Sequence, residues 1–210
     1  MVGDRPHFVG ISSDLARRAD TIDSELFMSH VPVPPEAPGI LGLFAFRPET
    51  AGPLNALADA LLRGPSSLSR GERELVAAFV SSRNHCEFCC GSHSAFAAHQ
   101  LEGGYDVVDA ALEAPEKAPV SERMRALLAV AAEVQRGGRE VRAETVASAR
   151  AAGADDVAIH DTVLIAAAFC MFNRYVDGLA TTPAPGRPAY DEMAKLIVEH
   201  GYVGSATAMG

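Results

Sequence analysis

Three side chains of types that suit thiol chemistry lie close together in the sequence. Cys86 and Cys89 form a Cys-x-x-Cys pattern, and His93 follows Cys89 by four residues. If this stretch is helical, all three side chains share one face, because residues three, four and seven apart lie on the same side of a helix. The first turn of a helix favours a thiolate, and an imidazole one turn away can exchange a proton with a thiol. The pattern therefore indicates reactive-thiol chemistry.

A carboxylate, Glu74, is the predicted partner of His93. If a helical hairpin turns at residues 83–84, Glu74 lies as far before the turn as His93 lies after it, so the two side chains should meet. A carboxylate in that place can orient the imidazole and stabilise its charge. Cys86 would then close a disulfide on a sulfenic acid formed at Cys89. The order of attack stays open, because the helix N-terminus favours Cys86 and the base favours Cys89.

Two helices are needed to position these residues. Ser69 and Glu72 form a capping-box pattern that predicts the start of the first helix, which runs through Val80. The second helix is predicted to begin near residues 84–86 and to end at 99 or 100, before Gly103-Gly104. Together they would form the hairpin that carries the Cys-x-x-Cys motif.

The rest of the chain is also predicted to be helical. Apolar residues follow helical spacing almost throughout, and no stretch shows sustained strand alternation, so the fold class is all-α. We expect three parts: an N-terminal wrapping arm over 1–52, a helical core over 53–182 and a C-terminal linker and helix over 183–210. The further helices are expected from Pro53 to 62, from Met124 to 136, over 141–152, over 155–180 and over 190–200.

Composition excludes several classes of protein. The 210 residues are 48% hydrophobic and 21% charged, which is typical of a globular chain. The formal net charge of −9 and the lack of a basic run argue against nucleic acid as a partner. The longest apolar run, residues 163–172, is shorter than the ~18 residues of a membrane span. The first residues do not resemble a secretory signal, and clustered cysteines suit a reducing compartment, so we expect a cytoplasmic protein.

The spacing of these residues resembles that of a known family. Glu74, the stretch SSRNHCEFC at 81–89 and His93 are similar to the signature of the alkylhydroperoxidase D and carboxymuconolactone decarboxylase family, and specifically to its peroxidase-related branch. The resemblance extends more loosely from about residue 20 to the end of the chain, including residues 172–178 and 190–203. The motif is specific because it fixes a Glu, two Cys and a His at set spacings.

The resemblance implies an all-helical alkylhydroperoxidase D-like fold, a homo-oligomer and reduction of hydroperoxides through a cysteine pair with a Glu and His proton relay. These roles fall on Glu74, Cys86, Cys89 and His93. We therefore expect a thiol-dependent peroxidase or disulfide oxidoreductase that reduces small organic hydroperoxides, with no metal, haem or flavin cofactor. A separate thiol or dithiol must be the reductant. The apolar helix over 157–180 also favours a homo-oligomer, because it offers more apolar surface than a small monomer usually exposes.

Other interpretations of the same residues stay open. A closed zinc site needs four ligands, and this chain has one Cys-x-x-Cys pair that only His85 and His93 could complete. A zinc-stabilised or non-catalytic helical oligomer is therefore one alternative. A carboxymuconolactone decarboxylase-like lactone or decarboxylation enzyme, with His93 as base and the thiols incidental, is the other. Cys90 and Cys170 are expected to be packing residues, although Cys90 turns the motif into Cys-x-x-Cys-Cys.

Overall fold

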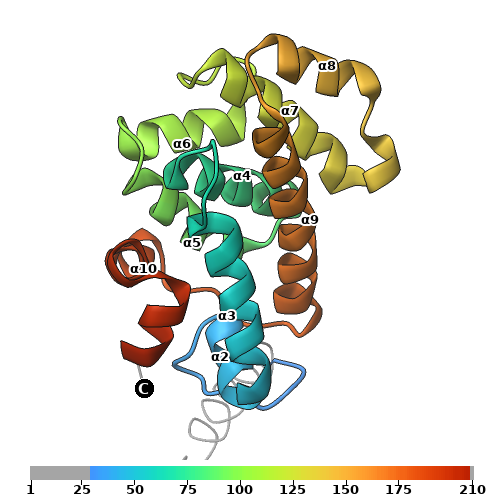
Figure 1. Cartoon of the computed structure of the whole chain (residues 1–210). Helices are drawn as coiled ribbons and strands as arrows, with labels where there is room; N and C mark the ends of the chain where they lie inside the picture. The colour runs from blue at the N-terminus through green and yellow to red at the C-terminus, as the bar shows by residue number, and fades with distance from the viewer. Residues whose placement is uncertain (1–28, 209–210) are drawn as a thin grey trace, which may run out of the picture.

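The computed structural model describes residues 29–208, and all regular structure within that range is helical. Figure 1 shows the helices packed around the hairpin of α4 and α5. The all-α fold class predicted from the apolar spacing is confirmed. The helices are α2 (Ile40–Phe46), α3 (Pro48–Arg63), α4 (Arg70–Arg83), α5 (Glu87–Ala98), α6 (Gly104–Glu113), α7 (Glu122–Arg136), the short 3₁₀ turn η1 (Gly138–Glu140), α8 (Ala143–Ala151), α9 (Asp156–Gly178) and α10 (Arg187–Ala208).

The predicted hairpin is present. Helix α4 begins after Ser69 with a complete capping box, in which the Ser69 hydroxyl accepts from the Glu72 N–H at 3.1 Å and the Glu72 carboxylate accepts from the Ser69 N–H at 2.8 Å. Helix α5 lies antiparallel to α4 and makes its main packing contact with it. Both helices present apolar residues to one core, which α7, α9 and α10 complete. The sequence therefore contained enough local information to define the scaffold of the site.

Two helices extend beyond their predicted bounds, and one helix was not predicted. Helix α3 begins at Pro48, so Pro53 lies inside it rather than at its start. An interior proline is tolerated here because the carbonyl that loses its partner, on Glu49, belongs to an exposed residue and can bind water. The last helix is longer than predicted and continues through a kink at Gly201. Helix α6 was not predicted, because Gly103-Gly104 indicated only a stop.

The three predicted parts of the chain stay a prediction. Residues 1–28 of the expected wrapping arm lie outside the described residues. From residue 29 on, the segment before α2 pairs with the segment after α9: the N–H of His30 donates to the Leu179 carbonyl, and that of Gly39 donates to the Thr182 carbonyl, both at 2.9 Å. At the other end, α10 packs on α3 and α5 and so contributes to the same core.

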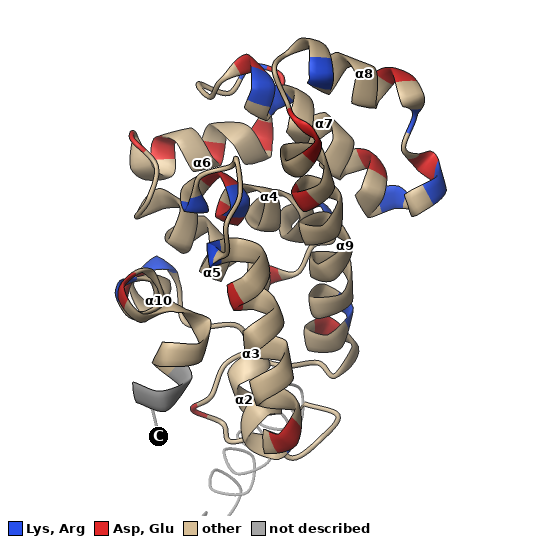
Figure 2. Ribbon diagram, in the orientation of Figure 1, with Lys and Arg blue, Asp and Glu red and all other residues tan. Residues whose placement is uncertain are grey.

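Helix α9 is long and apolar enough to cross a bilayer by length and composition alone. In the fold it packs against α4 and α7, and Ile165, Phe169 and Phe172 on its inner face are buried. A buried core helix of a helical bundle has the same length and apolar composition, so the hydropathy of α9 is weak support for a membrane span. Figure 2 shows the charged residues spread over α6, α7 and α8, whereas α2 carries none.

Candidate active site

The turn between α4 and α5 sets the position of the cysteines. His85 has a left-handed backbone (φ 60°), and the N–H groups of His85 and Cys86 donate to the carbonyls of Ser82 and Ser81, each at 3.0 Å. This is a Schellman termination of α4, at which glycine is usual and histidine is one of the tolerated alternatives. The chain leaves the turn extended at Cys86, which becomes the N-cap of α5. Cys86 therefore lies just before the first turn of α5, and Cys89 lies within that turn.

Side chains from α7 and α9 hold this turn in place. Asn84 donates to Asn173 Oδ1 at 2.8 Å and accepts from Gln135 Nε2 at 2.8 Å. Asn173 in turn donates to the Ser81 hydroxyl at 3.0 Å and is almost fully buried. Asn173 therefore links α9 to the turn between α4 and α5. A rigid turn matters here because the two cysteines lie directly beyond it.

The two motif thiols are free and buried. Cys86 is fully buried and Cys89 is only 4% exposed. The neighbouring Cys89 thiol and burial both raise the pKa of the Cys86 thiol, and the nearby Asp177 carboxylate acts in the same direction. Position at a helix N-terminus alone would have lowered it. The surroundings therefore keep Cys86 as a protonated thiol.

The side chains of the other two cysteines, Cys90 and Cys170, have different contacts. Cys90 faces Ser94, with 4.0 Å between the sulfur and the hydroxyl oxygen, and burial raises its pKa. Cys170, on α9, contacts Asn84 Nδ2 at 3.6 Å and the Gln135 carbonyl at 4.0 Å. Both are half-buried free thiols that pack between helices, as expected from their neighbours in the sequence.

Glu74 and His93 meet across the hairpin as the equal arm lengths predicted. Glu74 Oε2 lies 2.6 Å from His93 Nδ1, and Glu74 is only 1% exposed. A carboxylate can only accept, so Nδ1 carries the proton in this bond and Nε2 keeps a lone pair. Phe169 and Phe96 pack edge-on to the imidazole, with ring centroids 4.5 and 5.2 Å away. The ring is thus fixed in both orientation and tautomer.

A third residue, Tyr202 of α10, joins this pair and was not predicted. Its hydroxyl donates to Glu74 Oε1 at 2.8 Å, so each carboxylate oxygen of Glu74 has its own partner. Sequence spacing gave no signal for Tyr202, because it reaches Glu74 from 128 residues further along the chain. Among the hydrogen bonds of the described residues, none joins His93 to Cys89. That link, unlike the one between Glu74 and His93, stays a prediction.

A cavity of about 580 Å³ lies beside His93, enclosed by α2, α3, α5 and α10. Its polar lining consists of Asn55, Ser92, His93, Tyr202 and Ser205. The Ser92 hydroxyl is buried without a hydrogen-bond partner among the described residues. Neither motif cysteine is a lining residue. The remaining walls are apolar and are formed by Ile40, Leu41, Phe44, Ala45, Pro48, Ala51, Phe88, Phe96, Met193, Leu196 and Ile197. The cavity suits an apolar molecule with one polar group near His93.

Residues 48–114 match the carboxymuconolactone decarboxylase family. The predicted family resemblance is confirmed. Two solved structures are similar to nearly the whole chain. An uncharacterized peroxidase-related protein from Silicibacter sp. TM1040 is 27% identical, with a TM-score of 0.66 over 90% of this chain and 92% of that one. The alkylhydroperoxidase AhpD core of an uncharacterized peroxidase-related protein from Ralstonia eutropha JMP134 is 25% identical, with a TM-score of 0.66 over 90% and 94%. No curated protein matches the chain.

The segment that matches the carboxymuconolactone decarboxylase family holds Glu74, Cys86, Cys89 and His93, whereas Tyr202 lies well beyond it. The likeness to the AhpD core confirms the predicted alkylhydroperoxidase D-like fold. Within the part of the chain that the structure describes, no three His, Cys, Asp or Glu side chains gather in a metal-binding arrangement. The zinc alternative therefore finds no ligand set among those residues.

Proposed function

We propose that this protein is a thiol-dependent peroxidase that reduces organic hydroperoxides through Cys89 and Cys86. The observation that carries the proposal is a pair of buried free thiols, Cys86 and Cys89, at the start of α5, with Cys89 one helical turn before the imidazole that Glu74 orients. The protonated state favoured for Cys86 supports Cys89 as the attacking thiol. The likeness to peroxidase-related proteins agrees with this assignment.

The chemistry balances with the residues present and one external reductant. His93 Nε2 accepts the proton of Cys89, and the thiolate attacks the terminal oxygen of ROOH. The O–O bond breaks, the proton from His93 goes to the leaving alkoxide, and the products are ROH and a sulfenic acid on Cys89. Cys86 then attacks that sulfur, which releases water and forms the Cys86–Cys89 disulfide. A separate thiol or dithiol must reduce the disulfide to complete the cycle.

The cavity beside His93 gives the organic part of the substrate a place to bind. Its walls are apolar apart from a few polar groups near the imidazole. We therefore extend the predicted class of small organic hydroperoxides to include those with a bulky apolar group.

The test of this function is a thiol count before and after one equivalent of an organic hydroperoxide. We expect two of the four cysteines to disappear and mass spectrometry to place the new disulfide between Cys86 and Cys89. Cys90→Ser and Cys170→Ser variants should behave like the wild type and serve as matched controls. Four unreacted thiols, or a disulfide that uses Cys170, would contradict the proposal.

One observation favours a second candidate function. The cavity is lined by His93 and Tyr202 but not by either motif cysteine, an arrangement that would suit a lactone or decarboxylation reaction with His93 as base. The two functions differ in their response to thiol alkylation. Alkylation should abolish peroxide reduction but leave a His93-dependent lactone or decarboxylation activity intact.

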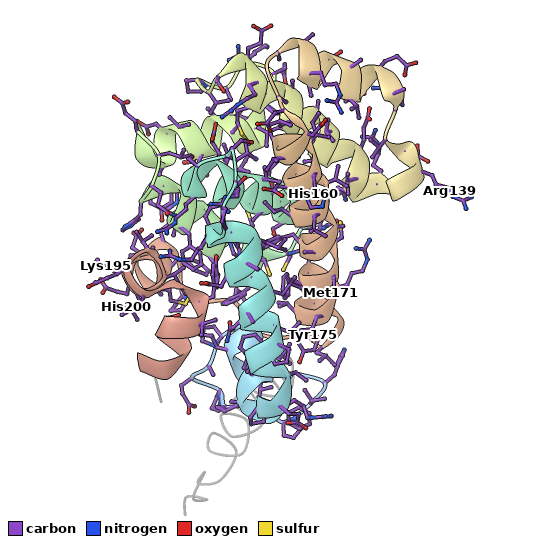
Figure 3. All side chains as sticks on the ribbon, in the orientation of Figure 1. Arg139, His160, Met171, Tyr175, Lys195 and His200 are labelled. Carbon is purple, nitrogen blue, oxygen red and sulfur yellow. The ribbon has the colours of Figure 1, made fainter. Side chains whose placement is uncertain are left out.

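We also propose that the protein is a homo-oligomer that uses the outer face of α9. Val157, Leu164 and Met171 lie seven residues apart on this face, and each is more than 40% exposed. Figure 3 shows Met171 on α9 together with His160, one turn from Leu164. Leu164→Glu should convert the oligomer into a monomer in light scattering, and Phe46→Glu, at an exposed apolar residue of α2, should not. A wild-type monomer at micromolar concentration would contradict this proposal.

A further inference from the structure

The C-terminal helix α10 has a kink at Gly201. The backbone there has φ 76° and ψ 178°, which favours glycine. A Cβ atom would lie 2.6 Å from Asp59 Oδ1. The same Asp59 oxygen accepts the N–H of Tyr202 at 2.9 Å, as an N-cap does at the start of a helix. The bend therefore requires glycine and is held by a specific contact from α3.

The other side of the bend is held by the next turn of α3. Arg63 Nη1 donates to the carbonyls of Ile197 and Val198, at 2.9 and 3.3 Å, where the first segment of α10 ends. Arg63 also forms an ion pair with Asp59 at 3.7 Å. One turn of α3 thus binds the free carbonyls before the bend and a free N–H after it. These contacts fix where Tyr202 enters the core.

Tyr202 uses this fixed position to contact Glu74. Its hydroxyl donates to Glu74 Oε1 at 2.8 Å, and its ring stacks on the His93 ring at 6.2 Å with 21° between the planes. Burial and the adjacent Glu74 charge raise the pKa of Tyr202 well above its usual value. The phenol therefore remains a proton donor throughout the pH range in which a histidine titrates.

Among the described residues, no side chain other than those of His93 and Tyr202 donates a hydrogen bond to Glu74. Within the described part of the chain, α4 presents Glu74 to the imidazole, α5 itself presents Phe96, and α9 presents the apolar Phe169. The charged residues of α3, Asp59 and Arg63, face Tyr202 and bind backbone groups of α10. Among the described residues, Glu74 therefore receives hydrogen bonds from two side chains, those of His93 and Tyr202.

We propose that Tyr202 is a positioning residue that, through Glu74, sets the pH range over which His93 can accept a proton. The proposal rests on the function given above, in which His93 is the base for Cys89. A hydrogen bond to a carboxylate takes up part of its negative charge. Without the phenol, Glu74 would attract the proton on His93 more strongly. His93 would stay charged, and unable to act as a base, up to a higher pH.

The test compares Tyr202→Phe with Tyr105→Phe. Tyr105 also donates to a carboxylate, Asp191, at 2.7 Å, but outside the site. The phenylalanine ring keeps the packing on His93, so the fold should survive. We expect the NMR titration midpoint of the His93 ring to rise by about one pH unit in Tyr202→Phe, as for a lost charge-assisted hydrogen bond. Tyr105→Phe should leave it unchanged, and Asp59→Ala should raise it by less.

Peroxide kinetics supply the second readout. The rate of Tyr202→Phe should fall roughly tenfold below pH 6, in line with a midpoint shift of about one unit, and should approach that of the wild type as pH rises. An unchanged His93 midpoint, or a rate loss of the same size at every pH, would overturn the proposal and leave Tyr202 a packing residue. If the wild type does not react with peroxide, the proposed function fails, but the NMR midpoint still tests the action of Tyr202 on His93.

Discussion

Among the described residues, two tyrosine–carboxylate–histidine groups occur, and both use helices α5 and α10. In the buried group, His93 of α5 and Tyr202 of α10 share the carboxylate of Glu74, one oxygen each, at 2.6 and 2.8 Å. The side chains of His93 and Glu74 are 11% and 2% exposed. Phe96 and Phe169 enclose the imidazole. All three residues of this group are therefore buried.

The second group lies at the surface. His99, the C-cap of α5, and Tyr105 of α6 both contact one oxygen of Asp191 on α10, at 3.0 and 2.7 Å. The His99 and Asp191 side chains are about one-third exposed. Arg187 stacks over the Tyr105 ring at 4.4 Å and pairs with Asp109. Water and a permanent cation thus surround this group, which fastens α10 to α5 and α6.

The same three residue types thus lie in two different surroundings, and we propose a proton relay for the buried group alone. Water screens the surface group, so its charges contribute little. Burial makes each hydrogen bond of the inner group decisive, because an unpaired buried carboxylate would be costly. The two groups also differ in whether a thiol lies near the histidine. Cys89 precedes His93 by one helical turn, whereas no cysteine lies within one turn of His99. Position relative to the thiols, rather than the triad itself, points to function.

Replacing the carboxylate of each group by its amide should change the rate of the peroxide reaction in one group and not in the other. In Glu74→Gln, the amide oxygen would accept from Tyr202 and the amide nitrogen would donate to His93 Nδ1. This moves the imidazole proton to Nε2, the nitrogen that must accept the thiol proton. We expect the peroxide reaction to slow by about tenfold to a hundredfold, the usual cost of losing the partner that orients a functional histidine. Stopped-flow rates should show no such loss for Asp191→Asn, and equal losses in both variants would remove the distinction between the groups.

A third carboxylate, Glu133, shows what burial does when a permanent cation is the partner. Burial raises its pKa, but the Arg142 N–H, the Thr145 hydroxyl and the Arg142 guanidinium outweigh this effect and lower it to about 2. A carboxylate with a lowered pKa in the folded state stabilises the fold above its ordinary pKa, and that contribution is lost as pH falls from about 4.5 toward 2.

Glu133→Gln should therefore lower the free energy of unfolding by about 2 kcal/mol near pH 7, as expected for lost hydrogen bonds to a charged group. It should change the rate of peroxide reduction little. Urea unfolding at pH 6 and pH 3 checks this directly. The wild type should lose more stability than the variant between the two pH values. A variant with the same acid sensitivity as the wild type would show that Glu133 is not the residue responsible.

Local sequence patterns predicted the part of the site that lies within the hairpin. The capping box at Ser69, the turn near residues 83–84 and the offset between Glu74 and His93 all depend on helical geometry over short distances, and the structure has each of them. Tyr202 could not be predicted in this way, because its contact with Glu74 depends on how α10 bends and packs. That bend is encoded by Gly201 together with Asp59, two residues far apart in the sequence.

Helix α6 was missed for a local reason. Helix α5 ends at Ala98, close to the predicted end at 99 or 100, but Gly103, with a left-handed backbone (φ 88°), is the N-cap of a new helix that begins at Gly104. Its buried side chains, Val108 and Ala111, are only three residues apart, with Tyr105 and Leu112 partly buried beside them. So short an apolar stripe is a weak helix signal in a single sequence. Packing of α6 against α5 supplies the stability that the pattern did not reveal.

The central claim is that His93 acts as the base for Cys89, and the pH dependence of a His93→Ala variant tests it most directly. His99→Ala is the matched control, since it removes the histidine of the surface group. We expect His93→Ala to slow the reaction with an organic hydroperoxide by roughly a hundredfold to ten-thousandfold near neutral pH. The loss should shrink as pH rises, because the thiol then ionises unaided, and His99→Ala should react like the wild type. An unchanged rate for His93→Ala near neutral pH would contradict the claim.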